Sequence, residues 1–217
     1  VKFTVDLSPP ETRHDVHTNF IGDVLSTSST IQLSGKDKLS GLKTMFYHID
    51  DQSEATVYEK DEIKLNELSD GEHSVTYYSD DNVLNREAKK KYSFYLDRIP
   101  PIATHQFEVD HHREGDTDYI SQRTKIKLSA TDNKIGVDLI EYKFTEDVPK
   151  DGEKRKKTAK KAKKKDKAKR YTYETYSESF LTPFESGHHL VSFRSKDKLG
   201  NMCKVVRLPV RMDTTPP

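Results

Sequence analysis

Hydrophobic and polar residues alternate along short stretches over most of the chain. Residues 31–36 and 126–131 alternate at every position, and residues 71–81 and 187–197 continue an apolar alternation after a glycine. A period of two predicts β-strands, because successive side chains of a strand point to opposite faces. Turn signals recur every ~8–12 residues, a spacing typical of antiparallel β-sandwiches. The apolar runs are a few residues long, far below the ~20 residues that span a bilayer, so we expect no membrane-spanning segment.

One motif, an apolar residue followed by Asp-x-x-Pro-Pro, occurs three times along the chain. It covers residues 5–10, 96–101 and 212–217, and each copy follows or ends an alternating run. Proline fixes its own φ and pushes the preceding residue toward extended conformations. The motif therefore predicts a terminal strand that leads into a stiff, short linker.

Further landmarks repeat between these junctions. Residues 31–37 match 126–132, and residues 71–81 match 187–197. The spacing from Asp37 to Asp81 is 44 residues, whereas the spacing from Asp132 to Asp197 is 65 residues. The difference of 21 residues predicts that the second repeat is the first repeat with an insertion of that length in a mid-domain hairpin. Other matched landmarks are Gly41 with Gly136, residues 46–49 with 141–144, and Asn85 with Asn201.

We predict an all-β fold with two tandem Ig-like antiparallel β-sandwiches joined by short Pro-Pro linkers. Residues 1–9 are expected to be the end strand of a preceding repeat or a linker. Residues 10–100 form the first domain, and residues 101–217 form the second, with a Lys-rich insertion at 149–170 and a C-terminal linker. Hydrophobic residues make up only 32% of the chain. This share is below the ~45–50% of ordinary domains and favours two thin cores over one large core.

The second repeat resembles a known family through five groups of residues. They are residues 129–137, 141–142, 187, 193–201 and 213–217. This pattern is similar to the bacterial Ig-like repeat of large envelope and secreted proteins, most of all to the version named after a leptospiral outer-membrane protein. Residues 10–101 carry a degraded copy, with Gly35-Lys36-Asp37 in place of Ala-Thr-Asp. The resemblance implies an exported protein at the cell surface, associated with the outer membrane or extracellular.

Three functions follow from this fold and this resemblance. The favoured one is a non-catalytic structural or binding module, namely a stalk, adhesin segment or assembly scaffold, of a longer exported bacterial surface protein. The alternatives are an accessory domain pair of a secreted polysaccharide-degrading enzyme and a subunit of an envelope or motility complex that docks through the basic insertion. We expect no enzyme activity, since the sequence has no G-x-S-x-G elbow and no phosphate-binding glycine loop. Neighbouring repeats of the same chain are the first expected partners.

Aspartates occupy equivalent positions at the repeat junctions. In a sandwich, the loop after the second strand and the last hairpin loop lie at one pole, where the first strand also enters. Two interpretations stay open for these residues: a Ca²⁺ site, because Ca²⁺ takes 6–8 oxygen ligands, or turns closed by side-chain to backbone hydrogen bonds. No other cofactor is expected. The first set is Asp6, Asp37 and Asp81, and the second set is Asp97, Asp132 and Asp197.

Charge is distributed unevenly although the net charge is +1. Residues 150–170 hold 13 basic and 3 acidic residues, which leaves 24 basic and 33 acidic residues elsewhere. Such a stretch is either a solvated, disordered loop or a contact for an envelope glycan, a lipopolysaccharide or an acidic protein. Nucleic acid is not expected, because no aromatic residue lies within the stretch to stack on a base. The candidate contacts are Lys154, Arg155, Lys156, Lys157, Lys160, Lys161, Lys163, Lys164 and Lys165.

The remaining polar and aromatic residues favour structural roles. His73 and His189 are equivalent in the two repeats, which favours packing or hydrogen bonding. The adjacent histidine pairs at 111–112 and 188–189 point to opposite faces of a strand, so zinc is disfavoured. The single cysteine, Cys203, is expected to be a small buried residue of the last strand. Tyr47, Tyr77, Tyr142 and Phe193 are predicted core residues, and Tyr78, Tyr173 and Tyr176 are expected to point outward.

Overall fold

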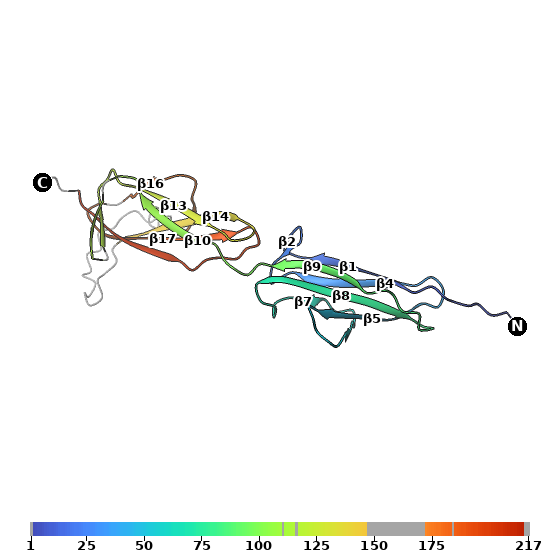
Figure 1. The fold of residues 1–217 in the computed structure, drawn as a ribbon. Coiled ribbons are helices and arrows are strands. Elements are labelled where there is room, and N and C mark those ends of the chain that lie inside the picture. The colour runs from blue at the N-terminus through green and yellow to red at the C-terminus, as the bar shows by residue number, and fades with distance from the viewer. Residues whose placement is uncertain (1, 110, 116, 147–171, 184, 215–217) are drawn as a thin grey trace, which may run out of the picture. The chain divides into compact units, whose positions relative to one another are not determined.

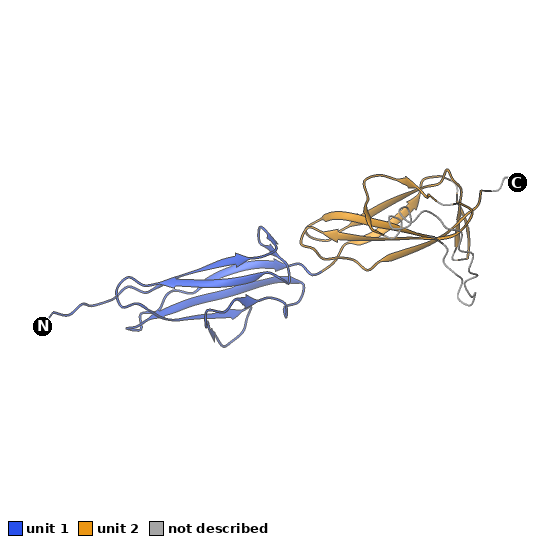
Figure 2. Cartoon of the chain, turned by 180° about the vertical axis from the view of Figure 1, so that it is seen from behind, with its two compact units in different colours: residues 1–98 blue, residues 99–217 orange. Residues whose placement is uncertain are grey.

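The computed structural model describes residues 2–109, 111–115, 117–146, 172–183 and 185–214, and every regular element in these ranges is a β-strand (Figure 1). The chain divides into two compact units, Val1–Arg98 and Ile99–Pro217, here called the first and second unit (Figure 2). Each unit is a sandwich of two sheets, so the predicted all-β class and the tandem sandwiches are confirmed. No described segment forms a helix that is long and apolar enough to cross a bilayer.

The first unit places a three-stranded sheet, in the order β1-β4-β7, against a six-stranded sheet, in the order β2-β3-β9-β8-β5-β6. Neighbouring strands are antiparallel except β3 and β9, which run parallel. The strands are β1 (Glu11–His17), β2 (Phe20–Ile21), β3 (Val24–Leu25), β4 (Thr30–Lys36), β5 (Leu42–Ile49), β6 (Thr56–Val57), β7 (Ile63–Lys64), β8 (Gly71–Asp81) and β9 (Lys90–Leu96).

The core of the first unit follows from the alternation of its strands. In β4, Ile31 and Leu33 are buried while Gln32 and Ser34 are exposed. Such alternation turns one face of each sheet toward the other sheet and leaves the opposite face to water. Tyr77 of β8 is buried in this core as predicted. The buried cluster consists of Leu25, Ile31, Leu33, Met45, Tyr58, Ile63, Leu65, Val75, Tyr77, Phe94 and Leu96.

The second unit repeats this topology with sheets β10-β13-β16 and β11-β12-β18-β17-β14-β15. Its one parallel pairing, β12 with β18, corresponds to β3 with β9. The strands are β10 (Ile102–Phe107), β11 (His112–Glu114), β12 (Thr117–Ile120), β13 (Lys125–Thr131), β14 (Val137–Glu146), β15 (Glu174–Thr175), β16 (Phe180–Leu181), β17 (Gly187–Asp197) and β18 (Val206–Met212).

Both units also share their local irregularities. The register slips between Leu42 and Thr44 in the first unit and between Val137 and Leu139 in the second. The glycine just before each slip, Gly41 or Gly136, has a positive φ of 88° or 84°, which glycine adopts without steric penalty. The two glycines therefore take the same turn conformation in both units, in keeping with their matched places in the two repeats.

Residues 2–10 contain no strand, and Phe3 and Leu7 are 84% and 81% exposed, which agrees with the linker alternative for residues 1–9. Their assignment to the end strand of a preceding repeat stays a prediction.

Two expectations about single segments are wrong. Cys203 lies before β18 and not within it, and it is half-buried against the second core. Tyr176 packs against that core instead of pointing outward.

Tyr78 points outward as expected, but it is buried on that face. It lies on the outer face of the six-stranded sheet, opposite the inward-facing Tyr77, yet only 7% of it is exposed. Phe46 stacks on its ring at 5.1 Å between centroids, and the Arg86 guanidinium lies 5.1 Å from the same ring centroid. Neighbouring side chains on the outer face therefore cover it.

Candidate functional site

Three of the predicted aspartates meet at one end of the first unit. Asp6 precedes β1, Asp37 follows β4, and Asp81 ends β8. One carboxylate oxygen of each lies within 4.8 Å of the other two. The topology brings them together because the ends of β4 and β8 and the entry to β1 share this pole.

Asp37 closes the loop between β4 and β5. Its Oδ2 accepts hydrogen bonds from the amides of Leu39 and Gly41 at 2.9 and 2.8 Å. These are local side-chain to backbone bonds of the kind that stabilise turns. Its other oxygen, Oδ1, is buried and has no hydrogen-bond partner among the described residues.

Asp81 closes the loop between β8 and β9 and is fully buried. Its Oδ1 accepts from the amides of Val83 and Asn85 at 3.0 and 2.8 Å, and its Oδ2 accepts from Asn85 Nδ2 at 2.8 Å. Burial by itself raises the pKa of Asp81, but the hydrogen bonds from Asn85 outweigh it and hold the pKa below 3.8. The Asn85 side-chain Nδ2 also donates to the Asp6 backbone carbonyl at 3.1 Å and so connects the entering chain to this loop.

Asp6 completes the cluster. Its two oxygens accept from the amides of Ser8 and Ser40 at 3.0 and 2.8 Å, and these hydrogen bonds lower its pKa below 3.8. The cluster therefore offers hard carboxylate oxygens, the donor type that Ca²⁺ prefers. The same hydrogen bonds also describe three turn-forming aspartates. The turn role is visible in the contacts, and Ca²⁺ binding stays a prediction.

The second repeat builds the same two loops. Asp132 Oδ2 accepts from the amides of Ile135 and Gly136 at 2.9 and 2.8 Å. Asp197, fully buried, accepts from the amides of Leu199 and Asn201 at 2.8 Å each. Asp97 is also fully buried but belongs to the first unit. Because each unit is described by itself, the predicted meeting of Asp97, Asp132 and Asp197 stays a prediction.

The predicted basic contacts lie outside the described residues. Lys154 to Lys165 belong to the stretch 147–171, which follows β14 and precedes β15 in the sequence. Their role as a polyanion or partner contact therefore stays a prediction as well.

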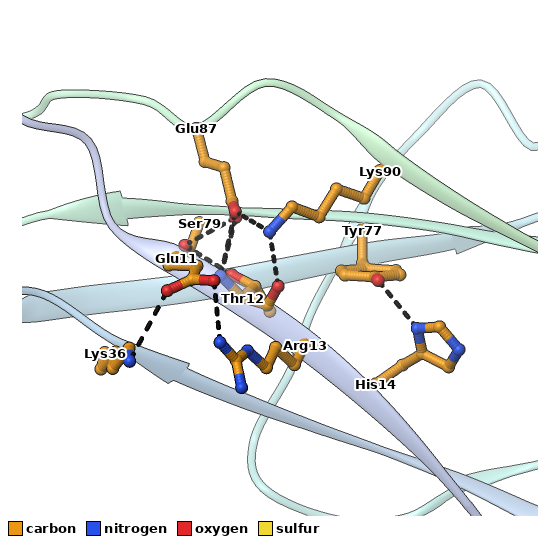
Figure 3. A network of polar contacts seen from close by, with 9 residues as sticks. All are labelled: Glu11, Thr12, Arg13, His14, Lys36, Tyr77, Ser79, Glu87 and Lys90. Atoms are coloured by element: carbon orange, nitrogen blue, oxygen red, sulfur yellow. Dashed lines mark hydrogen bonds and ion pairs between the residues drawn. The ribbon is translucent and has the colours of Figure 1, made fainter.

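A buried polar network inside the first unit has no counterpart in the sequence predictions (Figure 3). Glu87, 7% exposed, accepts from the amide of Thr12 with both oxygens at 3.0 and 3.2 Å. The Lys90 ammonium lies 2.5 Å from Glu87 Oε1 and donates to the Thr12 carbonyl at 2.7 Å. Thr12 Oγ1 donates to Ser79 Oγ at 2.7 Å. The network therefore fixes the edge strand β1 to β8 and β9 of the other sheet.

In the second unit, the positions equivalent to this network carry no charged residue. Positions equivalent to Thr12, Glu87 and Lys90 hold Ala103, Cys203 and Val206. There the Cys203 sulfur accepts from the amide of Ser195 at 3.1 Å. Aligning the two repeats position by position would have revealed that three polar residues replace three small or apolar ones.

Two histidines of the first unit have shifted pKa values with opposite signs. His14 of β1 stacks on Tyr92 at 4.3 Å and contacts Tyr77 Oη at 2.8 Å, and burial lowers its pKa below 6.5. Burial also opposes the charge on His73, but hydrogen bonds to the Asp50 carboxylate at 2.7 Å and the Ser69 carbonyl at 2.9 Å raise its pKa above 6.5. The hydrogen-bonding role predicted for His73 is confirmed.

Comparisons with known proteins concern the fold. No family model matches the chain, and no curated protein matches it by sequence. Among solved structures, the chain is similar to fibronectin(III)-like modules of CbhA from Clostridium thermocellum, with a TM-score of 0.42 and 9% identity over 93% of this chain and 94% of that one. It is also similar to a 1.5-MDa bacterial ice-binding adhesin, with a TM-score of 0.47 and 10% identity over 97% of this chain and 67% of that one. The D00–D0 domain of Intimin gives a TM-score of 0.31 and 11% identity over 93% of this chain and all of that one. At these values the likeness carries no inference about activity.

Proposed function

We propose that the chain is a non-catalytic structural and binding module of a longer exported bacterial surface protein, built from repeats of the leptospiral Ig-like kind. The observation that supports this proposal most is that the buried aspartates form equivalent hydrogen bonds in the two units. Asp81 of the first unit and Asp197 of the second unit accept hydrogen bonds from equivalent loop amides, those two and four residues further along the chain. Equivalent acidic residues thus stabilise the loop after β8 and the loop after β17, which is expected of units that repeat along a chain.

The function as a module implies that contacts with partners lie on exposed faces and loops. Loops and sheet faces of a rigid sandwich can vary without disturbing its core, so binding residues concentrate there.

The proposal is tested on the native polypeptide in cells. Intact mass and peptide mapping should return a chain with further repeats of this kind, and protease treatment of intact cells should release peptides of residues 1–217. A catalytic domain on the same polypeptide would make these units accessory to an enzyme. A native chain that ends near Pro217 and is recovered with one stoichiometric partner would instead identify a subunit of an assembly.

A further inference from the structure

A row of four side chains crosses the outer face of the six-stranded sheet in the second unit. His112 of β11 pairs in register with Tyr119 of β12, Tyr119 pairs with Arg211 of β18, and Arg211 pairs with His188 of β17. Residues directly opposite one another on neighbouring strands point to the same face. The neighbours of Arg211 in β18, Val210 and Met212, are buried, so the row itself faces outward. We call these four residues the His-Tyr-Arg-His row.

The row is held together by aromatic contacts and lies beside a cavity. The Arg211 guanidinium carbon lies 5.4 Å from the Tyr119 ring centroid, and Arg211 Nη1 donates to Tyr119 Oη at 3.4 Å. The His112 ring lies 6.0 Å from the Tyr119 ring on the other side. A half-open cavity of about 460 Å³ adjoins the row, and its lining includes Tyr119, Ser186, His188, Arg211 and Asp213.

Arg211 differs from the other outward-facing arginines that contact aromatic rings. Arg86 and Arg194 each bind a carboxylate, with the Arg86 Nε atom 2.7 Å from Asp80 and the Arg194 Nη2 atom 2.8 Å from Glu141. Within the described part of the chain, Arg211 has no such ion pair. Its guanidinium is therefore oriented by the Tyr119 ring, while the N–H groups that do not bond to Tyr119 Oη stay available to an anion.

The equivalent row of the first unit shows that the sheet does not require these residues. Register pairing there joins Ile21, Val24, Tyr95 and Glu72 across β2, β3, β9 and β8. This row is apolar and acidic, and its Tyr95 hydroxyl donates to Asp70 at 3.0 Å. The second unit thus places one arginine and two histidines on a scaffold where the first unit has no cation.

We propose that the His-Tyr-Arg-His row and its cavity bind a carboxylate-bearing saccharide, that is, an acidic glycan. Arg211 would take the carboxylate bidentately. The Ser186 and Tyr119 hydroxyls and the Asp213 carboxylate would exchange hydrogen bonds with sugar hydroxyls. The Asp213 carboxylate and the two hydroxyls favour a saccharide over an acidic peptide, because they exchange hydrogen bonds with the hydroxyl groups that a sugar has and a glutamate side chain lacks. Four strands span about 14 Å at the usual spacing of neighbouring strands, which accommodates a short run of linked sugar rings.

This inference names a ligand class for the proposed binding module and so rests on that function. The test is a titration of the full chain, labelled with ¹⁵N, with trigalacturonate, and with maltotriose as the neutral control. The amides of Tyr119, His188 and Arg211 should shift with trigalacturonate only. Arg211→Gln should weaken binding about tenfold, the value of a charge-assisted hydrogen-bonding pair. The affinity of Arg211→Lys, which keeps the charge but loses the planar guanidinium, should lie between the affinities of the unchanged chain and of Arg211→Gln.

Arg207→Gln is the matched control, since Arg207 is also exposed, lies in β18 and faces the same side. Equal weakening by Arg207→Gln and Arg211→Gln would overturn the proposal, as would shifts confined to residues 150–170 or equal shifts with maltotriose. Tighter binding of hexaglutamate than of trigalacturonate would overturn it in favour of an acidic protein partner. An unchanged spectrum at every concentration would refute this ligand class alone, because the cell-surface experiment tests the module function separately.

Discussion

The Lys90 ammonium lies 2.5 Å from the buried Glu87 carboxylate, and the same ammonium donates to the backbone carbonyl of Thr12 at 2.7 Å. Glu87 in turn accepts from the backbone amide of Thr12. One ion pair therefore satisfies both backbone groups of a residue in the edge strand β1 (Figure 3). A buried pair of this kind matters most when one partner is removed, because the other partner and the backbone groups then lose their hydrogen bonds.

Replacing Glu87 tests the network. Glu87→Ala should lower the free energy of unfolding of the first unit by about 3 kcal/mol, at the low end for a broken buried pair because Lys90 retains partial access to water. Glu87→Gln keeps an acceptor for the Thr12 amide and should be less destabilising. The measurement is urea unfolding followed at amide signals of β1 and β8, because two units need not unfold together.

Glu11→Gln is the matched control for Glu87. Glu11 also bonds to two cations, Arg13 and Lys36, but its side chain is 49% exposed. Exposed ion pairs contribute little, so this variant should leave the unfolding curve almost unchanged. An equal effect of the two substitutions would show that the buried network has no special role.

Calcium should stabilise the first unit if the predicted cation site at Asp6, Asp37 and Asp81 binds it. Binding to the folded state alone raises the melting temperature with ligand concentration. Millimolar Ca²⁺ should therefore raise the melting temperature, EGTA should reverse the effect, and Asp37→Asn should abolish it. Asp61→Asn, an exposed carboxylate between β6 and β7, should leave the effect intact. A melt that does not respond to Ca²⁺ would leave the three aspartates with their turn-forming role only.

The pH dependence of stability should be opposite for His14 and His73. The pKa of His14 is lowered by burial, so the unfolded chain binds the proton more readily and stability is lost as the pH falls through 6.5. The raised pKa of His73 contributes stability that is present below 6.5 and is lost as the pH rises through the folded-state value. Amide hydrogen exchange of the first unit between pH 5 and 8 should show less acid destabilisation in His14→Phe and more in His73→Gln.

His17→Gln, at an exposed position of β1, is the control for the substitution of a histidine as such. Parallel pH profiles for His14→Phe and His73→Gln would contradict the assignment of opposite signs.

Deletion of residues 150–170 tests the predicted polyanion contact. The deleted stretch holds 13 basic residues, whose binding to a polyanion releases counterions and weakens steeply with salt. The full chain should be retained on heparin at low salt and elute as salt rises, and the deletion variant should elute at a much lower salt concentration. Elution of both at the same salt concentration would move the contact to the described surface, where Arg211 is the first residue to replace.

The strand pattern and the turns could be predicted because both depend on neighbours in the sequence. The alternation in residues 31–36 predicted the strand β4, and the alternation in residues 126–131 predicted the strand β13. Asp37 and Asp132 bond to amides within four residues, so their turn role was accessible from spacing alone. Residues 2–5 alternate in the same way but carry no strand in this structure, because a strand also needs a partner strand beside it, which local alternation does not report.

The duplication, the all-β class and the loops closed by aspartate follow from the order of residues alone. The bond between Glu87 and Thr12, 75 residues apart, depends on the folded arrangement of the strands. The same holds for the row formed by His112, Tyr119, Arg211 and His188. The physical reason is register. The period of a strand fixes which face a side chain takes, but the strand order and the offset between strands fix its neighbours, and a slip of one residue would move Arg211 into the core.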